Sequence, residues 1–133
     1  MSDFRIVDLV GIPFLRGSST RTGADCWGLG EILFLEGRGI VLPAYNVDVR
    51  YQNQRASIRA VRASIAHEVR RAWRRLEEGE AALPYDAVVW GDHIAWVSED
   101  PLHILSTSEE LKSSYLRKWP EQVAGVYRYV GPS

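Results

Sequence analysis

Two stretches in the first part of the chain space their apolar residues as a helix does. The apolar stretch after Asp25 ends at two glycines and Asp25 can cap it, so the pattern predicts a helix over about Cys26–Glu36. From Gln54 to Glu78, apolar residues recur every three or four positions, which predicts a long second helix ended by Gly79. The apolar positions of this second stretch are Ile58, Val61, Ile65, Val69, Trp73 and Leu76.

Beyond position 84 the pattern changes to short runs of strand-forming residues. Three of them, joined by tight turns, predict an antiparallel meander. These runs are Ala87–Trp90, Ile94–Val97 and Leu102–Leu105. Val123–Val130 predicts a last strand, and Ser108 is expected to cap a short helical turn that extends to Tyr115. Helices followed by a sheet predict an α+β fold with both helices packed on the antiparallel sheet.

Composition narrows the class of protein. With 133 residues, 46% of them apolar and 25% charged, the chain has the balance of one globular domain over residues 1–133. Sixteen basic residues against seventeen acidic ones give no overall attraction to nucleic acid, and no apolar run is long enough to span a membrane. Nothing resembles a secretory leader, so we expect synthesis in the cytoplasm.

Basic residues gather on one face of the expected second helix. They are Arg55, Arg59, Arg62, Arg70, Arg71, Arg74 and Arg75. Such a face is either a solvated surface or a docking surface for an acidic partner, because arginine binds carboxylates and phosphates bidentately. His67 lies on the side of this helix opposite Ile58 and is expected to be structural.

Cys26 is the single cysteine, so it forms no intrachain disulfide or CxxC metal site. At the start of a helix, unpaired N–H groups and the positive end of the helix stabilise a thiolate, which is the nucleophilic form. The alternative is that Cys26 is a small buried apolar residue of the core.

Two of the three histidines fall in the expected meander. If the turn between the second and third runs is centred near Glu99, His93 faces Leu105 and is a diagonal neighbour of His103 on the same face. One ring could then orient the other as a general base. The alternatives are two histidines without a role, or two ligands of a metal with no identified third ligand, which is a weak metal signal.

Several strings together carry a known pattern. They are GIPF at 11–14, TGADCWGL at 22–29, GIVLPAY at 39–45, YDAVV at 85–89, HIAW at 93–96, LH at 102–103 and GVYR at 125–128. They resemble the NlpC-type cell-wall cysteine peptidases, in the version found in phage tails and phage-like gene transfer particles. The similarity spans most of the chain, with the arginine-rich helix as an insertion.

The resemblance implies a small papain-like fold, an activity and a site. Cys26 would be the nucleophile, His93 the general base, and His103 the residue that holds the His93 ring in its productive tautomer; Asp25 would contact a substrate amine or cap the helix. The substrate would be a peptidoglycan stem peptide, with no metal or cofactor. The implied partners are tail-tip or hub proteins of the particle, and the implied place of action is the bacterial cell wall.

The chain also departs from the family pattern. Phe14 stands where members carry a tyrosine near the oxyanion site, Tyr85 replaces a glycine, and the link from Asp86 to His93 is short. Losing one oxyanion donor costs about 10²- to 10³-fold in turnover. A structural tail-tip subunit that keeps the fold and has little or no activity is therefore the alternative prediction.

Overall fold

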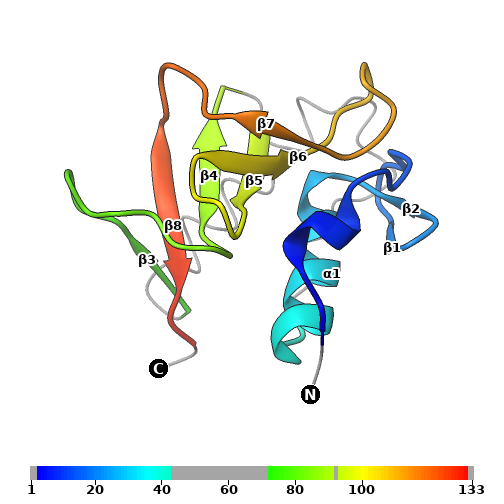
Figure 1. Cartoon of the computed structure of the whole chain (residues 1–133), viewed down its shortest axis with the longest axis horizontal. Coiled ribbons are helices and arrows are strands. Elements are labelled where there is room, and N and C mark those ends of the chain that lie inside the picture. Colours follow the sequence, from blue (N-terminus) through cyan, green and yellow to red (C-terminus); the bar gives the residue numbers. More distant parts are fainter. Residues whose placement is uncertain (1–2, 43–71, 92, 132–133) are drawn as a thin grey trace.

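The computed structural model describes residues 3–42, 72–91 and 93–131. In these residues one α-helix packs on an antiparallel sheet, so the α+β prediction is confirmed (Figure 1). The N-terminal part holds the 3₁₀ helix η1 (Ile6–Leu9), the strands β1 (Ser19–Thr20) and β2 (Gly23–Ala24), and α1 (Cys26–Arg38). The main sheet has the strand order β3-β8-β4-β5-β6-β7. Its strands are β3 (Trp73–Arg75), β4 (Ala87–Trp90), β5 (His93–Val97), β6 (His103–Ser106), β7 (Tyr115–Lys118) and β8 (Gly125–Tyr129).

Helix α1 begins and ends as its sequence predicts. The Asp25 side chain accepts a hydrogen bond from the Gly28 N–H at 2.7 Å, which satisfies one of the donors left open at a helix start. At the other end Gly39 adopts the left-handed conformation, with φ at 66°, and its N–H donates to the Leu35 carbonyl. The helix is two residues longer than predicted, ending at Arg38.

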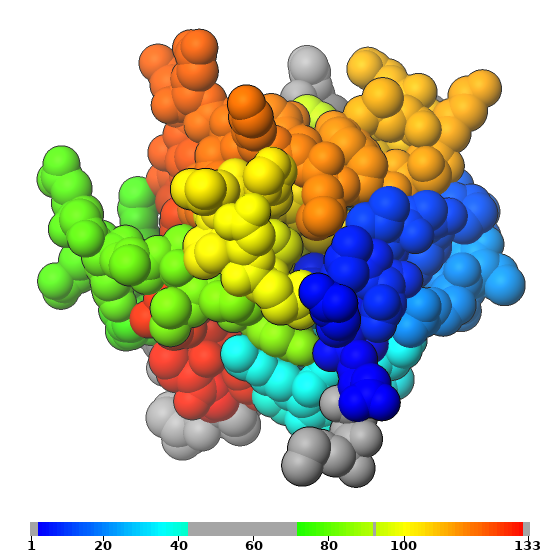
Figure 2. Space-filling model, viewed as in Figure 1, coloured from blue at the N-terminus to red at the C-terminus, as the bar shows by residue number. Residues whose placement is uncertain are grey.

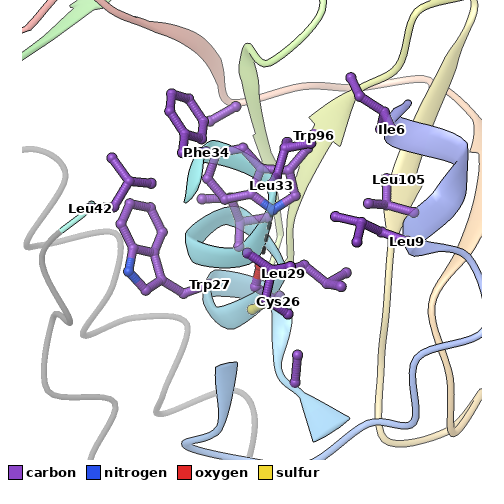
Figure 3. Packing of buried hydrophobic residues seen from close by; sticks show 14 of the residues in the cluster. Ile6, Leu9, Cys26, Trp27, Leu29, Leu33, Phe34, Leu42, Trp96 and Leu105 are labelled. Atoms are coloured by element: carbon purple, nitrogen blue, oxygen red, sulfur yellow. Dashed lines mark hydrogen bonds between the residues drawn. The ribbon is translucent and has the colours of Figure 1, made fainter. Parts of the chain in front are cut away.

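The core lies between α1 and one face of the main sheet (Figure 3). It is rich in aromatic rings, among them the fully buried Trp27, Trp73, Trp96 and Phe34. The rings of Trp27 and Trp96 meet at 5.5 Å between centroids. Rings of this size remove the largest apolar areas from water, so they hold α1 on the sheet.

A glycine sets how closely α1 approaches the sheet. A Cβ at Gly30 would overlap the six-membered ring of Trp96, so only glycine allows this contact. The Trp96 Nε1–H donates to the carbonyl of Cys26 at 3.0 Å, shown as the dashed line in Figure 3. The first turn of α1 is therefore tied directly to β5.

The opposite face of the sheet carries a smaller apolar cluster. Its buried members are Val88, Ala95, Val97 and Ile104, and partly buried side chains such as Trp90 and Trp119 pack around them. Adjacent residues of β5 thus divide between the two clusters, with Ile94 and Trp96 under α1 and Ala95 and Val97 on the other side.

An ion-pair network joins β3, β4 and β8. Arg128 binds the buried Asp86 through Nε at 3.0 Å and Nη2 at 2.8 Å. It also contacts Glu80, which forms a two-point ion pair with Arg74. Bidentate pairs of this kind fix the relative placement of the strands that carry them.

The prediction that the second helix continues to Glu78 is wrong. Residues 73–75 form β3, in which Trp73 lies opposite Tyr129 of β8, and Gly79 belongs to a turn. The helical spacing fails here because Trp73 is held in the core between α1 and β8, where a strand satisfies its backbone by pairing. Positions 54–71 of that prediction, with His67 and most of the arginine face, lie outside the described residues.

The strand predictions hold with small shifts. Ala87–Trp90 is confirmed as β4, and β5, β6 and β8 overlap the predicted runs with ends that differ by one or two residues. The predicted helical turn from Ser108 to Tyr115 is wrong, because only a single turn follows Ser108. Ser108 Oγ accepts from the Leu111 N–H at 3.1 Å, but the chain then enters β7, whose four residues pair with β6.

The loop at 98–102 packs on the N-terminal segment. Figure 2 shows this loop, in yellow, beside the N-terminal residues in blue. The Ile6 N–H donates to the Glu99 carboxylate at 2.6 Å, so η1 is bound to the turn between β5 and β6.

Candidate functional site

Cys26 is the first residue of α1 and is 5% exposed. It belongs to the same core cluster as Ile94, whose backbone N–H is one of the groups that lower the pKa of the thiol. Figure 3 shows Cys26 at the start of the helix, beside Trp96 and Leu29. The residue that follows His93 in the chain therefore lies near the thiol.

The surroundings of the thiol favour its neutral form. Burial raises the pKa of Cys26 well above its ordinary value, and the nearby Asp25 carboxylate raises it further. Backbone N–H groups of Cys26, Trp27 and Ile94 act in the opposite direction, as expected at a helix start, but do not outweigh burial. In this conformation Cys26 is a thiol rather than a thiolate at neutral pH.

Asp25 acts as a helix cap. One carboxylate oxygen accepts from the Gly28 N–H at 2.7 Å and the other from the Gly17 N–H at 2.8 Å. Burial raises the pKa of Asp25, and these hydrogen bonds oppose that change. Of the two roles implied for Asp25, the structure places it in the cap, with both oxygens already engaged.

His93 is the first residue of β5 and lies opposite Trp90 of β4. The two rings stack with centroids 5.2 Å apart and planes inclined by 27°. Trp90 packs on the cluster formed by Val88, Ala95 and Val97, so the imidazole is on the sheet face away from α1. Its neighbour Ile94 points the other way, toward Cys26.

His103 lies on the α1 side of the sheet but at the other end of the hairpin. The observed register pairs Trp96 with Leu105, so the main-chain position opposite His103 is Ser98. At a rise of about 3.3 Å per residue, five residues of strand separate the two histidine positions by roughly 16 Å. The His103 Nδ1 is bonded to the Asp100 carboxylate at 2.9 Å.

The prediction that the two imidazoles are neighbours on one face is therefore wrong. It assumed a turn centred near Glu99, whereas the observed pairing centres the turn between residues 100 and 101. Ser98 Oγ donates to the carbonyls of Asp100 and His103, and Asp100 accepts from the Leu102 N–H, which stabilises this longer turn. This change of pairing places His103 on the opposite face from His93.

Two of the departures from the family pattern, Phe14 and Tyr85, have local structural roles. Phe14 forms a bridge to Ala24 and donates its N–H to the Lys112 carbonyl, which ties the segment before α1 to the loop before β7. Tyr85 has a left-handed backbone, with φ at 79°, as suits a position where glycine is common. Its ring compensates by packing against Phe34 and under the Arg38 guanidinium, at 3.9 Å from centroid to Cζ.

Glu31 is a second unusual carboxyl that the sequence did not single out. It lies half-buried on α1, and burial, with help from Asp25, raises its pKa to about 7. A glutamate in a helix is ordinary in the sequence, and the residues of the β1–β2 hairpin that surround Glu31 are distant from it in the pattern. The sequence therefore gave no indication that its pKa would be raised.

The comparisons with known proteins add no further assignment. No protein-family model matches the chain, and no curated protein matches it. No helix within residues 3–42, 72–91 and 93–131 is long and apolar enough to cross a membrane. The same described residues contain no group of three histidine, cysteine or acidic side chains arranged to hold a metal ion.

Proposed function

We propose that this chain is a cysteine endopeptidase of a phage-type tail that cleaves peptidoglycan stem peptides at the cell wall. The observation that carries the proposal is that Cys26, the first residue of α1, and Ile94, the residue after His93, share one buried cluster, in which the Ile94 backbone N–H lowers the pKa of the thiol. The helix start and the strand that hold the implied nucleophile and base thus meet in space. The resemblance around DCWGL and HIAW supplies the chemistry.

In this proposal the Cys26 thiolate attacks a peptide carbonyl, and His93 holds the thiol proton. The carbonyl oxygen becomes an oxyanion, which the backbone N–H of Cys26 at the start of α1 stabilises. The tetrahedral intermediate then expels the amine, which takes the proton from His93, and leaves an acyl-enzyme. Water hydrolyses the thioester, with His93 as base, and returns the thiol.

Catalysis requires a conformer that differs from the one described. The His93 ring must leave Trp90 and reach the α1 side of β5, and the thiol must become accessible. His93 is the terminal residue of β5 and follows the turn at Gly91, which has a left-handed φ of 48°. A rearrangement of this hairpin end alone would move the imidazole without breaking the core beneath Trp96.

Digestion of purified sacculi tests this proposal. Wild-type protein and Cys26→Ala are incubated with sacculi and with a stem tripeptide, and newly freed amines are counted. We expect amine release by the wild type and none by the variant, with circular dichroism showing that both are folded. Equal amine release, or none from either protein, would refute the peptidase.

A second candidate is a structural tail-tip subunit that docks on a larger hub protein. It is favoured by the buried neutral thiol and by the position of His93 on the other sheet face. Arg74 and Arg75 are exposed, but Arg74 already binds Glu80 at two points and Arg75 binds the Ala124 carbonyl.

A separate measurement tests whether the arginine-rich part of the chain docks on a hub protein. Reversing the charge at Arg70 and Arg71 is expected to reduce incorporation into particles if this part of the chain binds an acidic hub. Unchanged incorporation would exclude that surface, whatever the result of the digestion.

A further inference from the structure

A small cavity lies between α1 and the β1–β2 hairpin, away from the first turn that carries Cys26. Its volume is about 190 Å³. Its lining residues come from the hairpin, from the middle of α1 and from the segment that follows the helix. They are Ser19, Thr20, Arg21, Glu31, Ile32, Leu35, Glu36, Val41 and Leu42.

Glu31 is the uncompensated charge in this cavity. Among the residues that the structure describes, none forms a hydrogen bond or ion pair with its carboxylate. The other two charged groups of the lining neutralise each other, because Arg21 and Glu36 form a two-point ion pair with one bond of 2.8 Å. The Asp25 carboxylate is close enough to raise the pKa of Glu31, so it adds to the negative potential.

Apart from the hydroxyl residues Ser19 and Thr20, the rest of the wall is apolar. Ile32 and Leu42 are buried, whereas Leu35 and Val41 are 54% and 80% exposed. A half-buried carboxylate beside exposed aliphatic side chains complements a cation with an aliphatic stem, since the stem covers the apolar wall while the charge meets the carboxylate. A single carboxylate is too few ligands for a divalent cation, which takes six or more oxygens.

We infer that this cavity binds the side chain of a lysine from a partner peptide, with its ammonium group on the Glu31 carboxylate. The volume of about 190 Å³ is large enough for a lysine side chain, which has five heavy atoms beyond Cα. The site does not depend on the proposed peptidase chemistry, because Cys26 does not line it.

The test is a titration of ¹⁵N-labelled protein at pH 7.5 with Nα-acetyl-lysine methylamide. We expect saturable shifts of the amides of the lining residues, and at least tenfold weaker binding by Glu31→Gln. The matched control is Glu110→Gln, an exposed glutamate outside the cavity, which should bind as the wild type does. Cys26→Ala should also bind normally, which separates this site from peptide cleavage.

Two comparison ligands make the result specific. Nα-acetyl-norleucine methylamide keeps a four-carbon stem but has no charge, and alanine methylamide keeps an ammonium group without the stem. Both should bind at least tenfold more weakly than the lysine compound. Equal binding of either ligand, or unchanged binding by a Glu31→Gln variant whose spectrum is folded, would overturn the inference.

Discussion

Replacing Asp86 by asparagine should destabilise the protein strongly. Asp86 is 1% exposed and accepts two bonds from Arg128 and one, at 2.9 Å, from the Leu83 N–H. The amide keeps the shape but removes the charge, and its NH₂ group cannot accept the bonds that one carboxylate oxygen now receives. Arg128, whose side chain is only 21% exposed, is then left with a weakened partner.

The expected size of the loss follows from these contacts. Removing one partner of a buried ion pair costs about 3–5 kcal/mol. Arg128 retains bonds to Glu80 and to the Ala81 carbonyl, so we expect the lower end, about 3 kcal/mol. For a domain of this length, that corresponds to a fall in Tm of about 11 °C.

Thermal and urea unfolding followed by circular dichroism measure this loss. The matched control is Glu121→Gln, at an exposed position, which should change Tm by less than about 2 °C. A double-mutant cycle with Arg128→Met should show that the two losses are not additive, because both remove the same pair. A fall in Tm below about 3 °C for Asp86→Asn, or simple additivity, would show that this pair does not hold β4 and β8 together.

Three further changes probe the helix, the cavity and the hairpin. Gly30→Ala should cost about 1–3 kcal/mol in urea unfolding, because its methyl group would collide with the Trp96 ring; no loss would mean that α1 does not pack this closely. The raised pKa of Glu31 means that the wild type loses stability as pH rises from about 4.5 through about 7, and Glu31→Gln should lack this loss in unfolding measured across that range. His103→Ala should leave any stem-peptide cleavage nearly unchanged, since its position is far along the hairpin from His93; loss of cleavage in a folded variant would restore its implied role.

The elements that local signals define could be predicted from the sequence. Asp25 caps α1 and Gly39 ends it, and both act within a few residues of the chain. The strand β4 follows from an uninterrupted apolar run that is buried on both faces. These features need no knowledge of distant contacts.

The predictions that are wrong concern elements whose structure depends on contacts between residues distant in the chain. Trp73 fits a helical stripe, but Tyr129 and α1 hold it in a strand. Tyr115–Lys118 has little strand pattern of its own and is a strand because β6 pairs with it.

The predicted arrangement of the candidate site residues is wrong for a related reason. The face on which His103 lies depends on whether the turn after β5 is centred near Glu99 or beyond Asp100, and the hydrogen bonds of Ser98 and Asp100 decide this. Apolar alternation cannot show such a difference. Likewise, the helix start at Cys26 indicates a stabilised thiolate, whereas burial between α1 and β5 dominates in the folded chain.

The pH dependence of Cys26 alkylation tests the peptidase account most directly. Rates with iodoacetamide are measured from pH 5.5 to 9.5 for the wild type and for His93→Ala. If the thiol proton passes to His93 in the reactive conformer, no net proton is lost. The wild-type rate should then level off below about pH 8.5, the range in which an ordinary thiol ionises, and His93→Ala should abolish that plateau. A rate that climbs about tenfold per pH unit throughout, in both proteins, would mean that Cys26 ionises alone and would contradict the proposed nucleophile and base.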